Sequence, residues 1–308
     1  MGGPPLARTT LDRAAEHRTD AVWLAEAWKT GLVLVIDVAK GGRVLVTGLD
    51  RDDASLVLVG ADAAPEGERL FLGVDLNGVP IFAVSSGLPE APQGAEARTL
   101  REIGDRLDPR DAGILTTAAA LGNWHASHLF SPQTGQPTTV MEAGWTRVGE
   151  DGKQMWPRTD PAMIVLVHDG VDGPEGRCLL GHNAAWPAVG GQLRFSCLAG
   201  YVEPGESAEA AVVREVREEV GIRLRSLHYE GSQSWPYPGS LMLGFLAEAD
   251  PAQPLVLDPA EIDDARWFTR AQVAEMIEGE FEADGVRIGL PMRSSIALYL
   301  VELWLQRP

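Results

Sequence analysis

The stretch GYVEPGESAEAAVVREVREEVGI, residues 200–222, constrains the fold more strongly than any other part of the sequence. Ser207 can cap a helix whose first turn carries Glu209, because a serine side chain accepts the free N–H groups of a helix start. Gly221 stands where the end of a helix favours a left-handed residue. These signals predict a helix from about Ala208 to Val220.

Acidic side chains gather on this predicted helix. Three valines recur every fourth residue and form an apolar stripe: Val212, Val216 and Val220. Three glutamates fall at positions i, i+3 and i+4 of an adjoining face: Glu215, Glu218 and Glu219. Like charges at this spacing repel, and Arg214 and Arg217 can relieve only part of the repulsion. A hard divalent cation such as Mg²⁺ would relieve the rest, whereas a solvated acidic face is the alternative.

The whole segment resembles the Nudix box, G-x5-E-x7-R-E-U-x-E-E-x-G-U with U an aliphatic residue, and matches its nine specified positions in register. A solvated acidic face alone would not explain this match. The resemblance implies a loop–helix–loop that binds metal ions together with a nucleoside diphosphate linked to another group. It makes Glu215 and Glu219 metal ligands, and Glu218 a ligand or the base that activates water. Glu206 would be a supporting carboxylate, and Arg214 would orient the glutamates.

A second motif narrows the substrate. Residues 232–240, SQSWPYPGS, resemble the S-Q-P-W-P-F-P-x-S array of the NADH pyrophosphatases, with serine for the first proline and tyrosine for phenylalanine. Prolines stiffen the segment, and the two aromatic rings offer flat faces to nicotinamide or adenine. The resemblance assigns substrate binding to eight residues: Gln233, Ser234, Trp235, Pro236, Tyr237, Pro238, Gly239 and Ser240. A proline-rich turn that packs an aromatic core is the alternative.

The same family implies contacts outside the two motifs. Ala199, the residue before the box glycine, would lend its backbone carbonyl to the metal. Glu261, matched through a D-P-x-E pattern, would add another ligand. Three further residues match positions that contact the substrate in this family: Trp156, Arg101 and Ala297.

The family also carries a four-cysteine zinc ribbon, and this chain keeps only its frame, in residues 130–135 and 147–158. Other residues occupy the four ligand positions: Ser131, Thr134, Val148 and Asp151. They cannot supply the thiolates that structural zinc requires. We therefore expect no structural zinc. The turns of the ribbon would instead be held by packing or by an oligomer contact. The nearby His125 and His128 are expected to have a structural role.

The 308 residues predict more than one domain. Short β-branched runs between residues 31 and 86 predict a β-rich N-terminal domain, and the apolar spacing from 100 to 128 predicts a helical hairpin or a broken helix. Residues 130–157 predict a linker or a small loop-rich module, and the same residues keep the frame of the zinc ribbon. Thereafter strands, including 255–258, alternate with helices, including one over 294–306. We expect an α+β protein with three parts: a β-rich domain at residues 1–122, a ribbon-like module at 123–157, and a Nudix α/β/α sandwich with a mixed sheet at 158–308. The resemblance implies that the first domain is a degenerate Nudix fold.

Composition excludes several classes of function. The net charge of −18 opposes general binding to nucleic acid, although metal ions and arginines can reverse the field at one site. Cys178 and Cys197 are too few for a disulfide framework and are expected to be buried thiols. No apolar run reaches the length of a membrane helix and the N-terminus lacks an apolar signal core, so we expect a cytoplasmic protein without a membrane partner.

The sequence thus predicts an enzyme that uses Mg²⁺ or Mn²⁺ to hydrolyse the pyrophosphate of NADH or NAD⁺. The products would be AMP and nicotinamide mononucleotide. The family resemblance also implies a homodimer. Two alternatives remain: removal of the NAD cap from the 5′ end of RNA by the same chemistry, and a nucleotide-binding module without catalysis.

Overall fold

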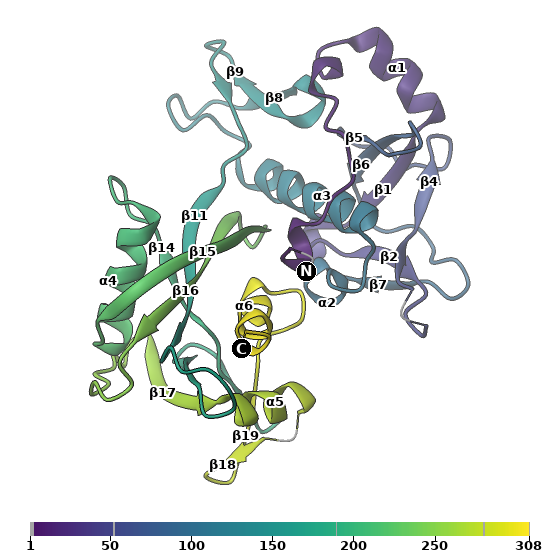
Figure 1. The fold of residues 1–308 in the computed structure, drawn as a ribbon. Helices are drawn as coiled ribbons and strands as arrows, with labels where there is room; N and C mark the ends of the chain where they lie inside the picture. Colours follow the sequence, from purple (N-terminus) through teal and green to yellow (C-terminus); the bar gives the residue numbers. More distant parts are fainter. Residues whose placement is uncertain (1–2, 52, 189, 280, 308) are drawn as a thin grey trace. The chain divides into compact units, whose positions relative to one another are not determined.

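The computed structural model describes residues 3–51, 53–188, 190–279 and 281–307, which form two compact units (Figure 1). The N-terminal unit comprises Pro5–Thr159 together with Ser234–Ser240. The C-terminal unit comprises mainly Asp160–Gln233 and the chain from Leu241 onward. The segment Ser234–Ser240 therefore packs with the N-terminal unit, although the chain on both sides of it belongs to the other.

Two sheets form the N-terminal unit's β-rich part. The larger has the order β4-β1-β6-β5: Leu58–Gly60, Leu32–Ile36, Pro80–Ser85 and Arg69–Val74. The smaller has the order β3-β2-β7: Ser55–Leu56, Val44–Thr47 and Glu96–Arg98. All five apolar runs predicted between residues 31 and 86 form strands, and one of them is divided between β3 and β4.

Among the described residues, three α-helices complete this part: α1 (Ala21–Thr30), α2 (Leu100–Ile103) and α3 (Pro109–Ser127). Asp108 accepts the backbone N–H of Asp111, and Pro109 occupies the first turn of α3. One face of α3 packs into the core of the sheets. The predicted broken helix over residues 100–128 is confirmed, with the break between α2 and α3.

Residues 130–157 contain a three-stranded antiparallel sheet, β10-β9-β8: Gln154–Met155, Thr146–Gly149 and Thr138–Met141. The prediction of a linker or loop-rich module was incomplete here. These strands are only two to four residues long, so they are too short to show the apolar alternation that marks a longer strand.

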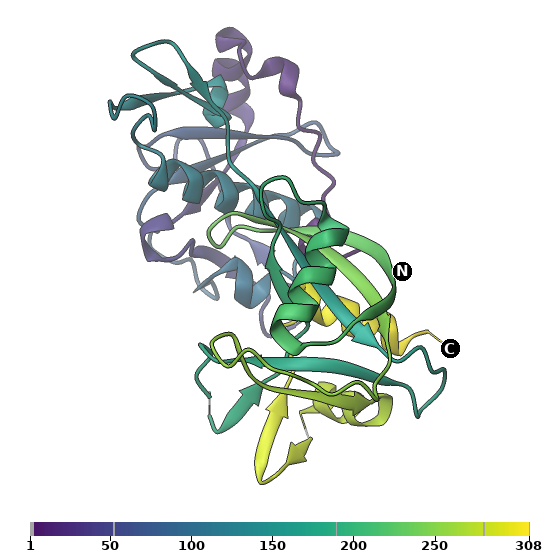
Figure 2. The ribbon, with the colours of Figure 1, turned by 90° about the vertical axis from the view of Figure 1, so that its left-hand side faces the viewer.

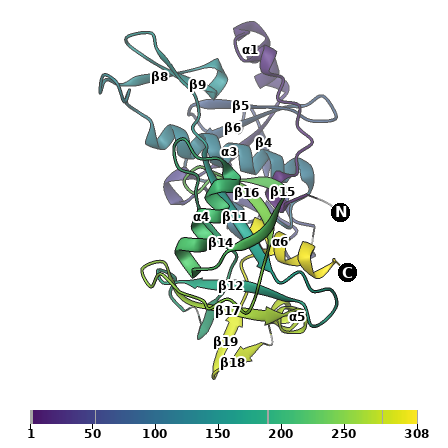
Figure 3. The same cartoon turned by 60° about the vertical axis from the view of Figure 1, so that its left-hand side comes forward.

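The C-terminal unit is built on a six-stranded sheet of order β15-β16-β11-β12-β17, in which β14 also pairs with β11. Its strands are Leu224–Trp235, Ser240–Ala249, Asp160–His168, Arg177–Asn183, Ile262–Thr269 and Leu198–Tyr201. Figure 2 shows α4 (Ala208–Val220) in front of this sheet and α6 (Ile296–Leu305) behind it, and Figure 3 shows the same layers from an intermediate direction. The helix α5 (Arg270–Glu278) shares the core of α6.

Strand β11 shows why helices cover both faces of this sheet. Met163, Val165 and Val167 pack in the core beneath α4. The alternate residues Ile164 and Leu166 pack in the core that includes α6. A strand that is apolar on both faces requires a cover on each, and the expected α/β/α sandwich is confirmed.

The C-terminal unit also contains a small sheet of order β13-β19-β18: Gln192–Arg194, Val286–Gly289 and Glu282–Ala283. The predicted strand over residues 255–258 is wrong. Val256 and Asp258 instead donate their N–H groups to the carbonyls of Val220 and Glu219. This segment therefore satisfies the free carbonyls at the end of α4, which no local sequence pattern indicates.

The two cysteines are free and buried, as predicted. Burial raises the pKa of Cys178 well above its usual value and that of Cys197 to about 12, so both remain protonated thiols near neutral pH. Within the described parts of the chain, the helices are all too short or too polar to cross a membrane.

Candidate active site

Helix α4 has the predicted bounds, and its ends form for the predicted reasons. Ser207 Oγ accepts the N–H of Ala210 at 3.1 Å, and Gly221 adopts a left-handed φ of 77°. The stripe of Val212, Val216 and Val220 is completely buried. The apolar stripe fixes the rotation of α4 on the sheet, and this rotation places its glutamates.

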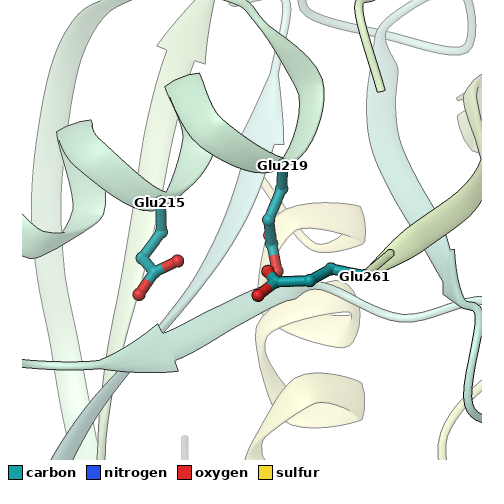
Figure 4. A group of neighbouring side chains, drawn as sticks. All are labelled: Glu215, Glu219 and Glu261. Carbon is teal, nitrogen blue, oxygen red and sulfur yellow. The ribbon is translucent and has the colours of Figure 1, made fainter. Parts of the chain in front are cut away.

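Three glutamates meet beneath α4: Glu215, Glu219 and Glu261. Each offers one carboxylate oxygen within 4.8 Å of the others, and Figure 4 shows Glu261 pointing toward the two helix residues. Glu215 and Glu219 are 8% and 3% exposed, whereas Glu261 is exposed. The backbone holds Glu261 in place, because its N–H donates to Asp258 and its carbonyl accepts the N–H of Ala184 at 2.8 Å.

The electrostatics of this trio favour a cation. Burial, followed by the charges of Glu215 and Glu261, raises the pKa of Glu219 to about 8. Burial likewise raises the pKa of Glu215 although Arg214 opposes the rise. Glu219 Oε2 is buried and has no hydrogen-bond donor. A buried carboxylate without a donor is costly, and an oxygen-preferring divalent ion supplies the missing charge, so these residues fit such an ion.

Strand β14 lies directly against Glu215. A Cβ on Gly200 would stand 2.0 Å from Glu215 Oε1, so only glycine leaves room for the carboxylate. Ala199 precedes Gly200 in this strand and pairs with Ile164 of β11. The box glycine therefore permits a close approach between the backbone and the Glu215 carboxylate, and Ala199 directly precedes this point of contact. Binding of a metal by the Ala199 carbonyl stays a prediction.

Arg214 joins the acidic residues of the box. Its Nε and Nη2 donate to the two carboxylate oxygens of Glu206, each at 2.9 Å. Its Nη1 lies 2.9 Å from Glu215 Oε1 and donates to Glu218 Oε2 at 3.0 Å. These bonds raise the pKa of Arg214 and lower that of Glu206. The guanidinium is thus fixed by Glu206 where it can orient Glu215.

Glu218 lies apart from the trio. Its side chain is 58% exposed and is held by Arg214. Because successive helix residues are separated by about 100°, Glu218 and Glu219 lie on opposite sides of Glu215. The expectation that three carboxylates of one helix turn converge is therefore met for two of them, and Glu261 supplies the third oxygen group. A role for Glu218 as ligand or base stays a prediction.

The aromatic array is held by the N-terminal unit. The Arg101 guanidinium lies 4.0 Å from the ring centroid of Tyr237 and 5.4 Å from that of Trp235. The two rings meet edge to face at 5.3 Å. Asn123 of α3 donates its side-chain amide to the carbonyl of Pro236 at 2.5 Å. The structure therefore brings Arg101 to the array, and adds Asn123, which no sequence signal indicated. Contact of Arg101 with substrate stays a prediction.

The remaining predicted contacts have different surroundings. Gln233 is 1% exposed and donates Nε2 to the carbonyl of Ser294 at 3.0 Å, which anchors the start of the array. Ser240 is also buried. Trp156 is exposed at the end of the ribbon, whereas Ala297 is buried in α6, where its carbonyl accepts the thiol of Cys197. Their contact with substrate stays a prediction.

The ribbon's turns are held by hydrogen bonds. Ser131 Oγ accepts the N–H groups of Gln133 and Thr134, and Asp151 Oδ1 accepts that of Lys153. Lys153 Nζ donates to Gln133 Oε1 at 2.9 Å and lies 3.5 Å from Asp151 Oδ2, so it links the two turns. The sequence predicts packing or an oligomer contact for these turns, and the structure adds hydrogen bonds within the chain.

Both nearby histidines have internal partners. His125 Nε2 donates to the carbonyl of Gly144, and its Nδ1 accepts from the buried Arg147 at 3.0 Å. His128 Nδ1 lies 3.1 Å from the carbonyl of Trp124. Over the part of the chain that the structure describes, the glutamate trio is the one group of histidine, cysteine or acidic residues arranged to hold a metal ion.

The α/β/α sandwich, the Nudix box and the glutamate trio together define a Nudix hydrolase. Comparison with known proteins gives the same class. The model of the NUDIX domain matches residues 159–286, and that of the NADH pyrophosphatase-like rudimentary NUDIX domain matches residues 31–124. The NAD-capped RNA hydrolase NudC of Mycobacterium tuberculosis is 40% identical, covering 98% of this chain and 94% of the relative.

Two further relatives extend this similarity. The NAD-capped RNA hydrolase NudC of Stutzerimonas stutzeri is 40% identical over 75% of each chain. The NAD-capped RNA hydrolase NUDT12 of Macaca fascicularis is 38% identical over 65% of this chain and 43% of its own. The chain therefore belongs to the NADH pyrophosphatase, or NudC-type, family of Nudix hydrolases, as its two motifs predicted.

Proposed function

We propose that this enzyme hydrolyses the pyrophosphate bond of NADH and NAD⁺, releasing AMP and nicotinamide mononucleotide. The observation that carries the proposal is the trio of Glu215, Glu219 and Glu261, in which one buried carboxylate oxygen, Glu219 Oε2, has no protein donor. Pyrophosphate chemistry needs a site of this kind, since hard metal ions shared with phosphate oxygens neutralise the developing charge. The rudimentary domain of the NADH pyrophosphatase type supports the substrate class.

Mg²⁺ or Mn²⁺ is the ion we propose for the trio, with the carbonyl of Ala199 as a further ligand. Such an ion, when bound, acidifies a bound water and offsets the charge on phosphate. Glu206 holds Arg214, and Arg214 holds Glu215 in its ligand orientation. Among the four glutamates that the box specifies, Glu218 is the exposed one, so we propose that it takes the proton that the attacking water releases.

The aromatic array supplies the contacts proposed for the nicotinamide or adenine ring. Trp235 and Tyr237 are pinned by Arg101 and by the bond from Asn123 to Pro236, so their ring faces are fixed before a ligand binds. A fixed aromatic surface binds a planar ring with little loss of conformational freedom. Trp156 and Ala297 remain proposed contacts of the same substrate.

The NAD cap of RNA is a second candidate substrate, because it contains the same linkage and the relatives above are named for it. The net charge of −18 opposes binding of a long RNA body and leaves recognition of the capped end open. A homodimer and a cytoplasmic location remain predictions from the sequence.

An assay of the purified protein with Mn²⁺ or Mg²⁺ tests the proposal. NADH, NAD⁺, ADP-ribose and NAD-capped RNA are supplied in parallel, and the products are resolved by chromatography. We expect AMP and nicotinamide mononucleotide from the free dinucleotides, with no turnover after a chelator removes the metal. Tight binding of NADH without AMP release would favour the non-catalytic alternative.

A further inference from the structure

The loop between β12 and β13 starts beside the glutamate trio. Of this loop, the structure describes residues 184–188 and 190–191. Its first residue, Ala184, donates its N–H to the carbonyl of Glu261 at 2.8 Å. After β13 the chain enters β14, where Gly200 lies against Glu215. Both ends of the loop therefore lead to residues of the trio.

An aromatic ring of this loop, that of Trp186, stacks on the guanidinium of Arg194, the last residue of β13. Arg194 Cζ lies 4.2 Å from the ring centroid of Trp186. His182 Nδ1 donates to the carbonyl of Arg194 at 2.9 Å. The rings of His182 and Trp186 meet edge to face, with their centroids 6.4 Å apart. The N–H of Trp186 donates to Asn183, which closes a turn. The pair is thus fixed by neighbours on β12, and Trp186 is only partly buried.

The position of the pair suits a nucleotide whose phosphate lies at the trio. Trp186 follows Ala184 by two residues, so its Cα lies within about 7.6 Å of the Ala184 Cα. Nucleobases stack on aromatic rings and on arginine planes, and arginine also pairs with phosphate. In a chain of net charge −18, an arginine–tryptophan stack next to a carboxylate site indicates a ligand that brings both a ring and negative charge.

We propose that Trp186 and Arg194 form a stacking site for a nucleobase of the substrate whose pyrophosphate is hydrolysed at Glu215, Glu219 and Glu261. This inference rests on the proposed function and adds a base contact outside the array of residues 233–240. Two sources share the chemistry: the adenine of a free dinucleotide, and the first base that follows the cap of an RNA.

Steady-state kinetics of Trp186→Ala on NADH and on NAD-capped RNA test the site. Loss of one base stack corresponds to roughly a tenfold fall in kcat/KM, carried mainly by KM because the stack binds rather than reacts. A fall on both substrates identifies adenine as the stacked base, and a fall on capped RNA alone identifies the following base. Trp186→Phe should restore most of the loss. Unchanged kcat/KM on both substrates would overturn the proposal.

A matched control separates stacking from damage to the fold. Tyr229→Ala removes another exposed aromatic of the same unit, one that contacts Phe245 and lies on β15, and should leave both rates unchanged. Mn²⁺ affinity of Trp186→Ala, measured by electron paramagnetic resonance, should equal that of the wild type. If the wild type hydrolyses neither substrate, the proposed function fails. Calorimetry with AMP then decides the stacking site alone, since equal affinity of wild type and Trp186→Ala would refute it.

Discussion

The family resemblance relates two regions to a metal: the glutamate trio to a divalent cation, and the ribbon of β8–β10 to the zinc site of the family. The two regions differ in how their polar groups are hydrogen-bonded. In the trio, Glu219 Oε2 is buried without a donor. In the ribbon, Ser131 and Asp151 accept backbone N–H groups, and Lys153 bridges the two turns. The two regions therefore differ in their donors: the trio leaves a buried carboxylate oxygen without one, which favours a cation, whereas donors within the chain hold the turns of the ribbon.

The largest test of this contrast is Glu219→Gln. The change keeps the shape of the side chain and removes the charge that holds the metal, so we expect kcat for NADH hydrolysis to fall by roughly 10³-fold, equivalent to several kcal/mol of transition-state stabilisation. The melting temperature should not fall. Glu209→Gln, an exposed position on the same helix, is the control and should keep full activity. Near-normal turnover of Glu219→Gln would refute its role.

The next test is Gly200→Ala. The added Cβ would meet the Glu215 carboxylate at 2.0 Å, so the ligand must move. Misplacement of a reacting or ligating group by about 1 Å can cost on the order of 10²-fold in rate, and we expect a loss of this size with weaker Mn²⁺ binding. Gly87→Ala, where the added atom meets nothing within 4 Å, should leave both quantities unchanged. Wild-type kinetics for Gly200→Ala would show that Glu215 is not confined.

A smaller effect is expected on stability as pH changes without metal. The pKa of Glu219 is raised from 4.5 to about 8 in the folded state, so between these values the folded protein binds more protons than the unfolded chain. The contribution of Glu219 to the free energy of unfolding is therefore fully present below pH 4.5 and is lost as pH rises toward 8. Urea titrations of the metal-free protein should show this loss, and Glu219→Gln should reduce it. An unchanged pH dependence in the variant would contradict the shift.

Saturating Mn²⁺ should reverse this trend. The ion requires ionised carboxylates, so its binding should strengthen as pH approaches 8 and should add to the free energy of unfolding. The same urea titrations with excess Mn²⁺ measure this gain. A gain of equal size in Glu219→Gln would show that the ion binds elsewhere.

The smallest effect is expected in the ribbon. Lys153→Met removes an exposed link between two turns, so the free energy of unfolding should fall by no more than about 1 kcal/mol. Hydrogen exchange should rise in the turns around Ser131 and Asp151 while activity stays near wild type. Elemental analysis should find no tightly held zinc, whereas about one zinc per chain would contradict the predicted loss of the metal.

Local sequence patterns predicted the elements whose ends and faces depend on neighbouring residues. Ser207 and Gly221 mark α4 because a side-chain cap and a left-handed glycine act within one turn. The strand prediction failed at residues 255–258, which pair with the end of α4, and it missed β8–β10, whose short strands lack an apolar period. These segments are set by long-range partners that a local pattern does not contain.

By itself, the sequence determined the family, the position of α4 and the identity of the glutamates, because a complete motif and helical spacing are readable along one chain. Only the tertiary structure decided which carboxylates meet. The packing of the valine stripe turns Glu215 and Glu219 inward and leaves Glu218 to Arg214, and the bond from Ala184 holds Glu261 at the trio. It also decided that Asn123 holds the aromatic array and that Lys153 joins the ribbon turns. These contacts join residues distant in sequence, and their geometry exists only once the chain has packed.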